Sequence, residues 1–132
     1  MVSRRAQLQV AFANAQALQE ASRFAEAERA WLDLEKEAPR HGGILVNLAM
    51  VQWQLGALDK AEDTAARAIE IGPEMEQAHA VHAAAAEARG ANSDAIKRYE
   101  RALELKPELT SVIYSLAHLH RRQGSLHRRD PC

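Results

Sequence analysis

Residues 56–73, GALDKAEDTAARAIEIGP, decide the fold, because a related segment, GANSDAIKRYERALELKP, follows at residues 90–107. The second segment begins thirty-four residues after the first, and the two share their glycine, their proline and several alanines in register. Self-similarity at this period indicates an array of helix–turn–helix units, each of which buries its apolar face against the next unit.

The same period runs through most of the chain as columns of matching residues. Two columns hold alanine, which lets paired helices approach closely: Ala15, Ala49, Ala83 and Ala117, and then Ala27, Ala61 and Ala95. A third column holds the prolines Pro39, Pro73 and Pro107, and a fourth holds Ser22, Gly56, Gly90 and Gly124. A bulkier column consists of Trp31, Ala65 and Tyr99.

These columns predict where helices begin and end. Glycine adopts the left-handed conformation that ends a helix without strain, so it closes the first helix of each pair. Proline cannot continue a helix, so it closes the second one. Asp59 and Glu62 have capping-box spacing at the start of one second helix. We expect helices at 5–21, 24–37, 43–55, 58–71, 76–89, 92–105 and 109–123.

The columns resemble those of the tetratricopeptide repeat over residues 8–123. We read three full repeats and the first helix of a fourth, at 8–41, 42–75, 76–109 and 110–123, between a lead-in (1–7) and a basic tail (124–132). The resemblance implies an all-α fold, a right-handed α-solenoid of antiparallel helix pairs with about seven helices.

The chain departs from the repeat pattern in the first, third and fourth repeats. Ser22 replaces glycine in the first repeat, and His82 stands in a leucine column of the third. In the fourth repeat Arg129 falls in an alanine column and Pro131 forbids a following helix. The last helix therefore exposes an apolar end face suited to self-association or to continuation of the array: Val112, Ile113, Leu116 and Ala117.

The amino-acid composition and net charge limit the kinds of molecule that we expect this protein to bind. Hydrophobic residues make up 47% and charged residues 27%, as in folded soluble proteins. A net charge of −1 provides no general attraction for nucleic acid or an anionic membrane, so we expect neither as a partner. We interpret the tail arginines as a solvated end. The only cysteine, Cys132, is the last residue, so no internal disulfide forms, and we expect a cytoplasmic location without a secretion signal.

First helices line the concave face of such a solenoid, and that face is used for binding. Helical spacing selects its residues, since neighbours on one face recur at intervals of three and four. The middle of this face is apolar and roomy, and its far end is basic. We predict a peptide-binding groove formed by Phe12, Gln16, Val46, Asn47, Met50, Trp53, Ala80, Ala84, Tyr114, His118 and Arg121. It suits an amphipathic helix or an extended peptide with apolar anchors and an acidic end. The alternative is that Trp53 and Met50 are plain core.

One subclass of the family clamps the carboxylates of chaperone C-termini with lysines, an arginine and asparagines. Of those positions only Asn47 matches here. The others hold Phe12, Gln16, Gln77 and Val81. The resemblance therefore disfavours a chaperone tail as the ligand.

No motif for chemistry is present. His79 and His82 have i, i+3 spacing, but no third metal ligand lies nearby in sequence, and we predict neither metal nor cofactor. No phosphate loop or nucleophile motif occurs. We expect a scaffold or adaptor module that binds a protein or peptide without catalysis. The alternative is the recruiting region of a longer enzyme, such as a sulfotransferase or glycosyltransferase that carries these repeats.

Overall fold

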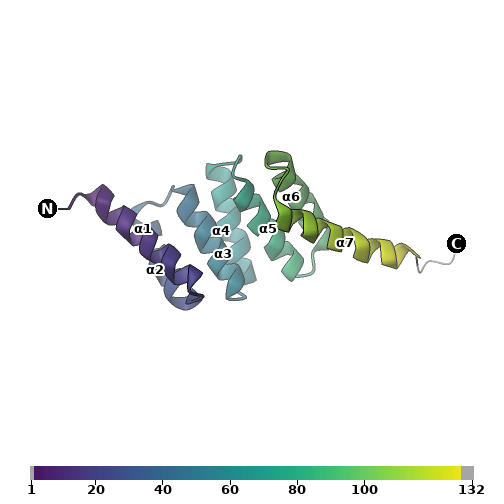
Figure 1. Cartoon of the computed structure of the whole chain (residues 1–132), viewed down its shortest axis with the longest axis horizontal. Coiled ribbons are helices and arrows are strands. Elements are labelled where there is room, and N and C mark those ends of the chain that lie inside the picture. Colours follow the sequence, from purple (N-terminus) through teal and green to yellow (C-terminus); the bar gives the residue numbers. More distant parts are fainter. Residues whose placement is uncertain (1, 129–132) are drawn as a thin grey trace.

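The helices follow the thirty-four-residue pattern closely (Figure 1). The structure, a computed structural model, describes residues 2–128, the side chains of 125–128 excepted. Over that range it contains no strand and seven helices: α1 (Arg4–Glu20), α2 (Phe24–Glu37), α3 (Gly42–Gln54), α4 (Leu58–Ile71), α5 (Glu76–Ala88), α6 (Asn92–Leu105) and α7 (Thr110–Arg128). Arg129, Pro131 and Cys132, on which some expectations rested, lie outside the described residues.

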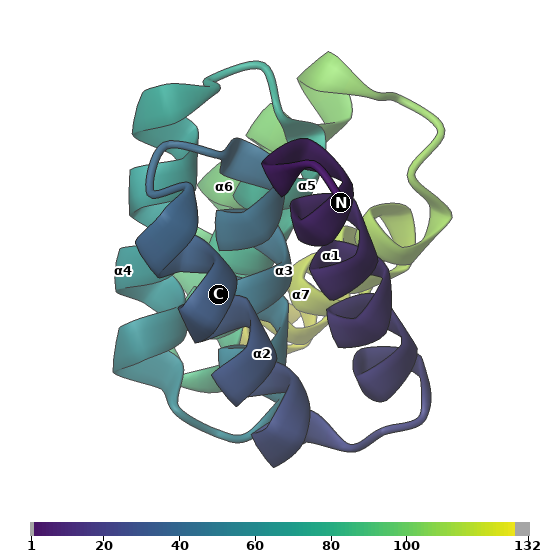
Figure 2. The ribbon, with the colours of Figure 1, turned by 90° about the vertical axis from the view of Figure 1, so that its left-hand side faces the viewer.

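Helices α1 to α6 form three antiparallel pairs stacked along the long axis, with α1 and α7 at opposite ends of the stack (Figure 1). Figure 2 looks along the stack, with α1 and α2 in front. This arrangement confirms the expected all-α, right-handed solenoid of helix pairs. The first helices α1, α3 and α5 are successive neighbours in the array, which brings their equivalent positions side by side.

The turn inside each pair is a Schellman motif. At the end of α3 the Ala57 amide donates to the Gln52 carbonyl (2.9 Å) and the Gly56 amide donates to the Trp53 carbonyl (3.0 Å). Gly56 and Gly90 have φ of +82° and +86°, as the glycine column predicts. Ser22 takes the same conformation with φ of 61°, although it carries a side chain that disfavours it.

The alanine columns lie where the helices pack most closely. Ala15, Ala49 and Ala83 are fully buried, and so are all three members of the second column. Ala117, the fourth member of the first column, is exposed. It differs because α7 has no second helix to pair with among the described residues.

The last helix departs from the prediction. It runs through Gly124 to Arg128, so the helix does not end at 123 and residues 124–128 are helical. A left-handed glycine is needed only where the chain turns back into a second helix, and α7 makes no such turn within residues 110–128. It continues along the long axis beyond the last pair (Figure 1).

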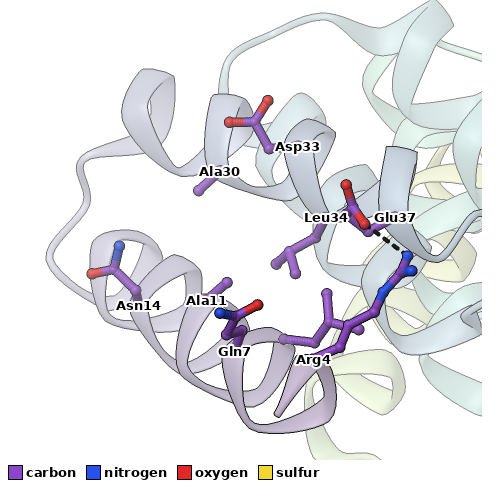
Figure 3. A pocket seen from close by; sticks show the side chains of 9 residues that line it. Arg4, Gln7, Ala11, Asn14, Ala30, Asp33, Leu34 and Glu37 are labelled. Atoms are coloured by element: carbon purple, nitrogen blue, oxygen red, sulfur yellow. Dashed lines mark hydrogen bonds and ion pairs between the residues drawn. The ribbon is translucent and has the colours of Figure 1, made fainter. Parts of the chain in front are cut away.

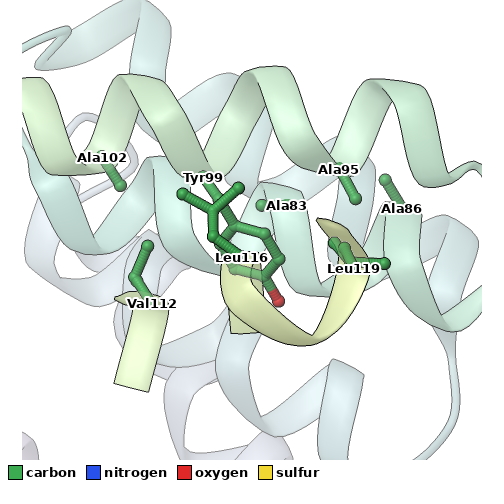
Figure 4. Close-up of a cluster of buried hydrophobic side chains, with 8 residues drawn as sticks. All are labelled: Ala83, Ala86, Ala95, Tyr99, Ala102, Val112, Leu116 and Leu119. Atoms are coloured by element: carbon green, nitrogen blue, oxygen red, sulfur yellow. The ribbon is translucent and has the colours of Figure 1, made fainter. Parts of the chain in front are cut away.

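Part of the predicted apolar end face is core. Val112 and Leu116 are buried with Leu119 against α5 and α6 (Figure 4). Of the four predicted residues only Ile113 and Ala117 are exposed, Ile113 by 45%.

The capping-box expectation was wrong. The N-cap of α4 is Ala57, whose carbonyl accepts the first helical hydrogen bond from the Ala61 amide (2.9 Å), and no side chain caps this end. Asp59 lies inside the first turn, where a carboxylate favours the helix dipole. Glu62 points to the next repeat instead.

Glu62 joins two repeats. Its carboxylate accepts two hydrogen bonds from Arg89 (2.8 and 2.9 Å) and one from Arg98 (3.0 Å). The Arg89 hydrogen bonds, helped by Arg98 and opposed by burial, lower the pKa of Glu62 to about 2. Arg98 also donates to the His82 carbonyl (3.1 Å). Burial, and then the charge of Arg98, lower the pKa of the neighbouring His82 side chain to about 4.

Candidate peptide-binding groove

A hollow of about 300 Å³, called here the central hollow, opens among α3, α5 and α7. Helix α3 contributes Met50 and Trp53 to it, and α5 contributes a row at helical spacing. Its described lining is Met50, Trp53, Gln77, Ala80, Val81, Ala84, Glu87, Tyr99, Leu109, Ser111, Val112 and Ser115. Four of the predicted groove residues, Met50, Trp53, Ala80 and Ala84, therefore meet in one place.

The sequence creates this hollow by putting small residues opposite large ones. Ala80 and Ala84 are one turn apart on α5, so their methyl groups leave room between the helices. Met50 and Trp53 form the opposite wall from α3. Trp53 is 40% exposed, which makes it one of the few large apolar side chains reaching solvent.

Two hydrogen bonds recur at equivalent positions of the first and third repeats. The indole N–H of Trp31 donates to Oε1 of Gln19 (3.0 Å), and the hydroxyl of Tyr99 donates to Oε1 of Glu87 (2.8 Å). In each case an aromatic side chain on the second helix is bonded to a polar side chain twelve residues earlier, on the first helix.

The second repeat reverses this arrangement. The aromatic position holds Ala65, which is fully buried, and the polar position holds Trp53. No hydrogen bond joins the indole N–H of Trp53 to any described residue. In the second repeat the large side chain is therefore on the first helix of the pair and not on the second, on the side of the central hollow.

Tyr99 and Glu87 form the polar end of the hollow. Burial, and then the hydrogen bond to Glu87, raise the pKa of Tyr99 above its ordinary value, so the hydroxyl stays protonated and keeps donating. This bond fixes one oxygen of the Glu87 carboxylate. Ser111 and Ser115 add hydroxyl groups from α7.

Phe12 and Gln16 lie in a separate hollow of about 600 Å³, towards the N-terminal end of the stack. Phe12 packs edge-on against Trp31, with ring centroids 4.8 Å apart and an interplanar angle of 83°. It also lies 5.9 Å from the His41 ring. Arg5 and His41 line this hollow as well.

Val46 and Asn47 do not present free side chains to either hollow. Val46 is only 5% exposed and packs with Leu45, Ala68 and Ala78, so its prediction as a groove residue is corrected to core. The Val46 side chain is covered because α5 packs against it through Ala78. The Asn47 amide donates to the Gly43 carbonyl one turn earlier in its own helix (2.9 Å).

The predicted residues of α7 lie apart from the central hollow. Tyr114 is 73% exposed, and His118 and Arg121 are also exposed. None of the three lines the hollow, where α7 instead contributes Ser111, Val112 and Ser115. Because successive helical residues are rotated by about 100°, Tyr114 points to a neighbouring face of the helix.

A third hollow, of about 660 Å³, lies between α1 and α2 on the N-terminal end of the stack and was not expected from the sequence (Figure 3). Arg4 and Glu37 form an ion pair of 2.8 Å at its edge. Its walls are the outward faces of α1 and α2. The spacing that we used to predict residues of the concave face does not select these residues.

His79 lies in a structural environment. His79 is buried, with Nε2 2.8 Å from the Pro73 carbonyl oxygen, to which it donates. The described residues contain no group of three side chains suited to hold a metal ion. Within the part of the chain that the structure covers, no helix is both long and apolar enough to cross a membrane.

The helices form a helical-repeat solenoid, and the central hollow lies among its first helices α3, α5 and α7. Residues 12–76, about half of the chain, match the family model of the tetratricopeptide repeat. With three helix pairs and the first helix of a fourth, the chain belongs to the tetratricopeptide repeat family. No curated protein matches the sequence significantly.

Solved structures share the whole fold. The first TPR domain of Spaghetti (RPAP3) bound to the HSP90 peptide SRMEEVD is 20% identical with a TM-score of 0.83, covering 89% of this chain and 93% of that one. The Sgt2 TPR domain from Aspergillus fumigatus is 18% identical with a TM-score of 0.87, covering 96% and 85%. A Thermobaculum terrenum O-GlcNAc transferase mutant is 22% identical with a TM-score of 0.85, covering 90% of this chain but 23% of that one. At these identities the likeness establishes the fold.

Proposed function

We propose that this protein is an interaction module that holds a peptide or a partner helix in its concave groove and performs no chemistry itself. The observation that carries the proposal is Trp53, a 40% exposed indole on the wall of the central hollow. Tryptophan is a frequent binding hot spot, and adaptable Met50 lies beside it. A scaffold or adaptor role follows.

The protein would bind its ligand by holding the groove residues in a fixed arrangement before the ligand arrives. The bond between Trp31 and Gln19 and the bond between Tyr99 and Glu87 fix each hairpin on either side of Trp53. A ligand therefore meets a groove that is already ordered, and the ordering cost on binding falls mostly on the ligand.

The ligand differs from that of the structural neighbour bound to the acidic peptide SRMEEVD. Phe12, Gln16, Gln77 and Val81 stand where the chaperone-tail subclass has its other clamp residues. Asn47, the one match, bonds its own helix. We expect a ligand anchored by apolar side chains instead.

Selection of a random dodecamer phage library on the purified protein tests the proposal. We expect peptides that bind the wild type and are lost on a Trp53→Ala variant. Leu32→Ala is the matched control, because Leu32 is a partly exposed apolar residue on a second helix, away from the groove. If no peptide is enriched, or if Trp53→Ala retains every peptide, the proposed groove is wrong.

A second candidate function is a recruiting region of a longer enzyme, such as a glycosyltransferase or sulfotransferase. It is favoured by the similarity to the O-GlcNAc transferase, of which this fold forms only a part. Reading the genomic sequence downstream of this chain distinguishes the two. An open frame that continues into an enzyme domain supports the second function.

We also propose a cytoplasmic location, from the cysteine usage, and self-association through the exposed Ile113 and Ala117 of α7. Neither a nucleic acid nor a membrane is proposed as a partner. Fractionation of the native cell tests the location: recovery with periplasmic or membrane proteins excludes it.

A further inference from the structure

The central hollow carries one negative charge. Among the described residues that line it, Glu87 is the only charged one, and it forms no ion pair with any described residue. Oε1 of Glu87 accepts the Tyr99 hydroxyl, while no protein donor within the described range bonds Oε2. A carboxylate in a mostly apolar hollow favours a positive partner.

Trp53 occupies the position equivalent to Glu87 on the neighbouring first helix, thirty-four residues earlier. Both side chains line the same hollow. A cation attracted by a carboxylate is also attracted by the face of an indole, and tryptophan is the strongest of the aromatic side chains in this respect. The two groups thus favour the same charge.

The floor of the hollow suits the stem of a long basic side chain. Ala80, Ala84 and Met50 provide an apolar surface of small or flexible groups. Lysine and arginine bury their methylene stems along such surfaces while the charged head reaches a polar partner.

His118 and Arg121, the predicted basic groove residues of α7, do not line the central hollow. Both are exposed on another face of α7. Glu87 therefore determines the charge preference inside the hollow, and any attraction of α7 for an acidic end acts outside it.

We infer that the central hollow binds an arginine or lysine side chain of the peptide ligand, with its charged head between Trp53 and Glu87 and its stem over Ala80 and Ala84. This inference rests on the proposed peptide-binding function and names the chemistry of the ligand. Its partner is a segment in which a basic residue lies among apolar ones.

The test uses the peptides selected on the wild type. We expect arginine or lysine to be enriched at one position. Replacing that residue by norleucine, or Glu87 by glutamine, weakens binding by about tenfold or more, since hydrogen bonds to charged groups are the stronger ones. Glu87→Gln keeps an acceptor for Tyr99, and its melting temperature verifies folding. Glu70→Gln, an exposed carboxylate of α4, is the charge-matched control and leaves affinity unchanged.

A second readout needs no selected peptide. Titration with Nα-acetyl-arginine amide shifts the indole N–H resonance of Trp53 while the resonance of buried Trp31 stays unmoved, and Nα-acetyl-glutamate amide shifts neither. Peptides that bind through Trp53 without a basic residue, and with equal affinity for Glu87→Gln, overturn the inference but leave the proposed function standing. Failure to select any peptide overturns the proposed function and the inference with it.

Discussion

The hydroxyl of Tyr99 donates a 2.8 Å hydrogen bond to Glu87, twelve residues earlier in the chain. The same relation joins Trp31 to Gln19 in the first repeat. In the second repeat Ala65 and Trp53 hold the two positions, and the hydrogen bond across twelve residues joins their neighbours instead, from the Thr64 hydroxyl to Gln52 (2.7 Å). The exposed indole of the groove therefore arises from an exchange of large and small residues within the scaffold columns.

Replacing Trp53 by alanine should remove peptide binding with little effect on folding. Trp53 is 40% exposed, so truncation removes little core, whereas Trp31 is fully buried. We expect Trp53→Ala to keep its helicity and lose at most about 1 kcal/mol of stability, against about 3–5 kcal/mol for Trp31→Ala. Circular dichroism during urea unfolding measures both. A loss for Trp53→Ala as large as that for Trp31→Ala means that Trp53 belongs to the core.

Glycine at position 22 should stabilise the protein. Ser22 has φ of 61°, a conformation that costs L-residues about 1–2 kcal/mol and glycine almost nothing. Because glycine also loses more chain entropy on folding, we expect Ser22→Gly to gain roughly 0.5–1 kcal/mol, seen as a higher melting temperature. Ala25→Gly, inside α2, serves as the opposite control and should destabilise. A melting temperature unchanged or lowered by Ser22→Gly contradicts the argument.

His82 should make the protein less stable in mild acid. Burial and Arg98 lower the pKa of His82 to about 4 from its ordinary 6.5, so the unfolded chain binds more protons between these values. Its stabilising contribution is complete above pH 6.5 and is lost as the pH falls towards 4. We expect His82→Leu, which restores the leucine column, to flatten stability over this range, as measured by urea unfolding at several pH values. His120→Leu, at an exposed position, should leave the slope as in the wild type, and equal slopes for all three proteins would refute the expectation.

Glu62 should control stability at lower pH. The two hydrogen bonds from Arg89, with the one from Arg98, lower the pKa of Glu62 from 4.5 to about 2. Its contribution is present above pH 4.5 and is lost as the pH falls to 2. At neutral pH we expect Glu62→Gln to lose about 1–2 kcal/mol. Below pH 2 the variant and the wild type should converge, and a constant difference between them across the whole pH range speaks against this account. Asp63→Asn, at an exposed neighbouring position, is the control.

Self-association through α7 predicts a concentration-dependent sedimentation coefficient. Ile113 is 45% exposed, so Ile113→Glu should leave folding intact and keep the chain monomeric at concentrations where the wild type associates. A wild type that sediments as a monomer at high concentration, indistinguishable from Ile113→Glu, rules the association out.

Sequence columns predicted most of the fold because their residues act locally. Gly56 and Gly90 take the left-handed conformation at the ends of their helices, as the glycine column predicts, and α2, α4 and α6 have the predicted bounds. The prediction that α7 ends before Gly124 was wrong because a glycine permits a turn without forcing one. The prediction that Asp59 caps α4 was wrong because the N-cap is Ala57, two residues earlier, so Asp59 lies inside the first turn. Glu62 is bound instead by arginines of the next repeat. Spacing within one helix carries no information about such partners.

The candidate site was harder to predict than the fold. Helical spacing brought Met50 and Trp53 to the same face as expected, and Ala80 and Ala84 to the facing helix. It could not tell that Val46 is covered by α5, or that Tyr114 points away from the hollow. Nor could it tell that Glu87 is the only charged residue among the described lining of the hollow, or that the Tyr99 hydroxyl donates to it.

Glu62 lies in the second repeat, while both arginines that bind its carboxylate lie in the third. The cooperative unit of unfolding should therefore not coincide with the thirty-four-residue repeat. We expect α4, α5 and α6 to open together in hydrogen exchange. A chain truncated after residue 75 would strand this carboxylate without its cations, so its loss of stability should exceed that of losing one neighbour's apolar contacts.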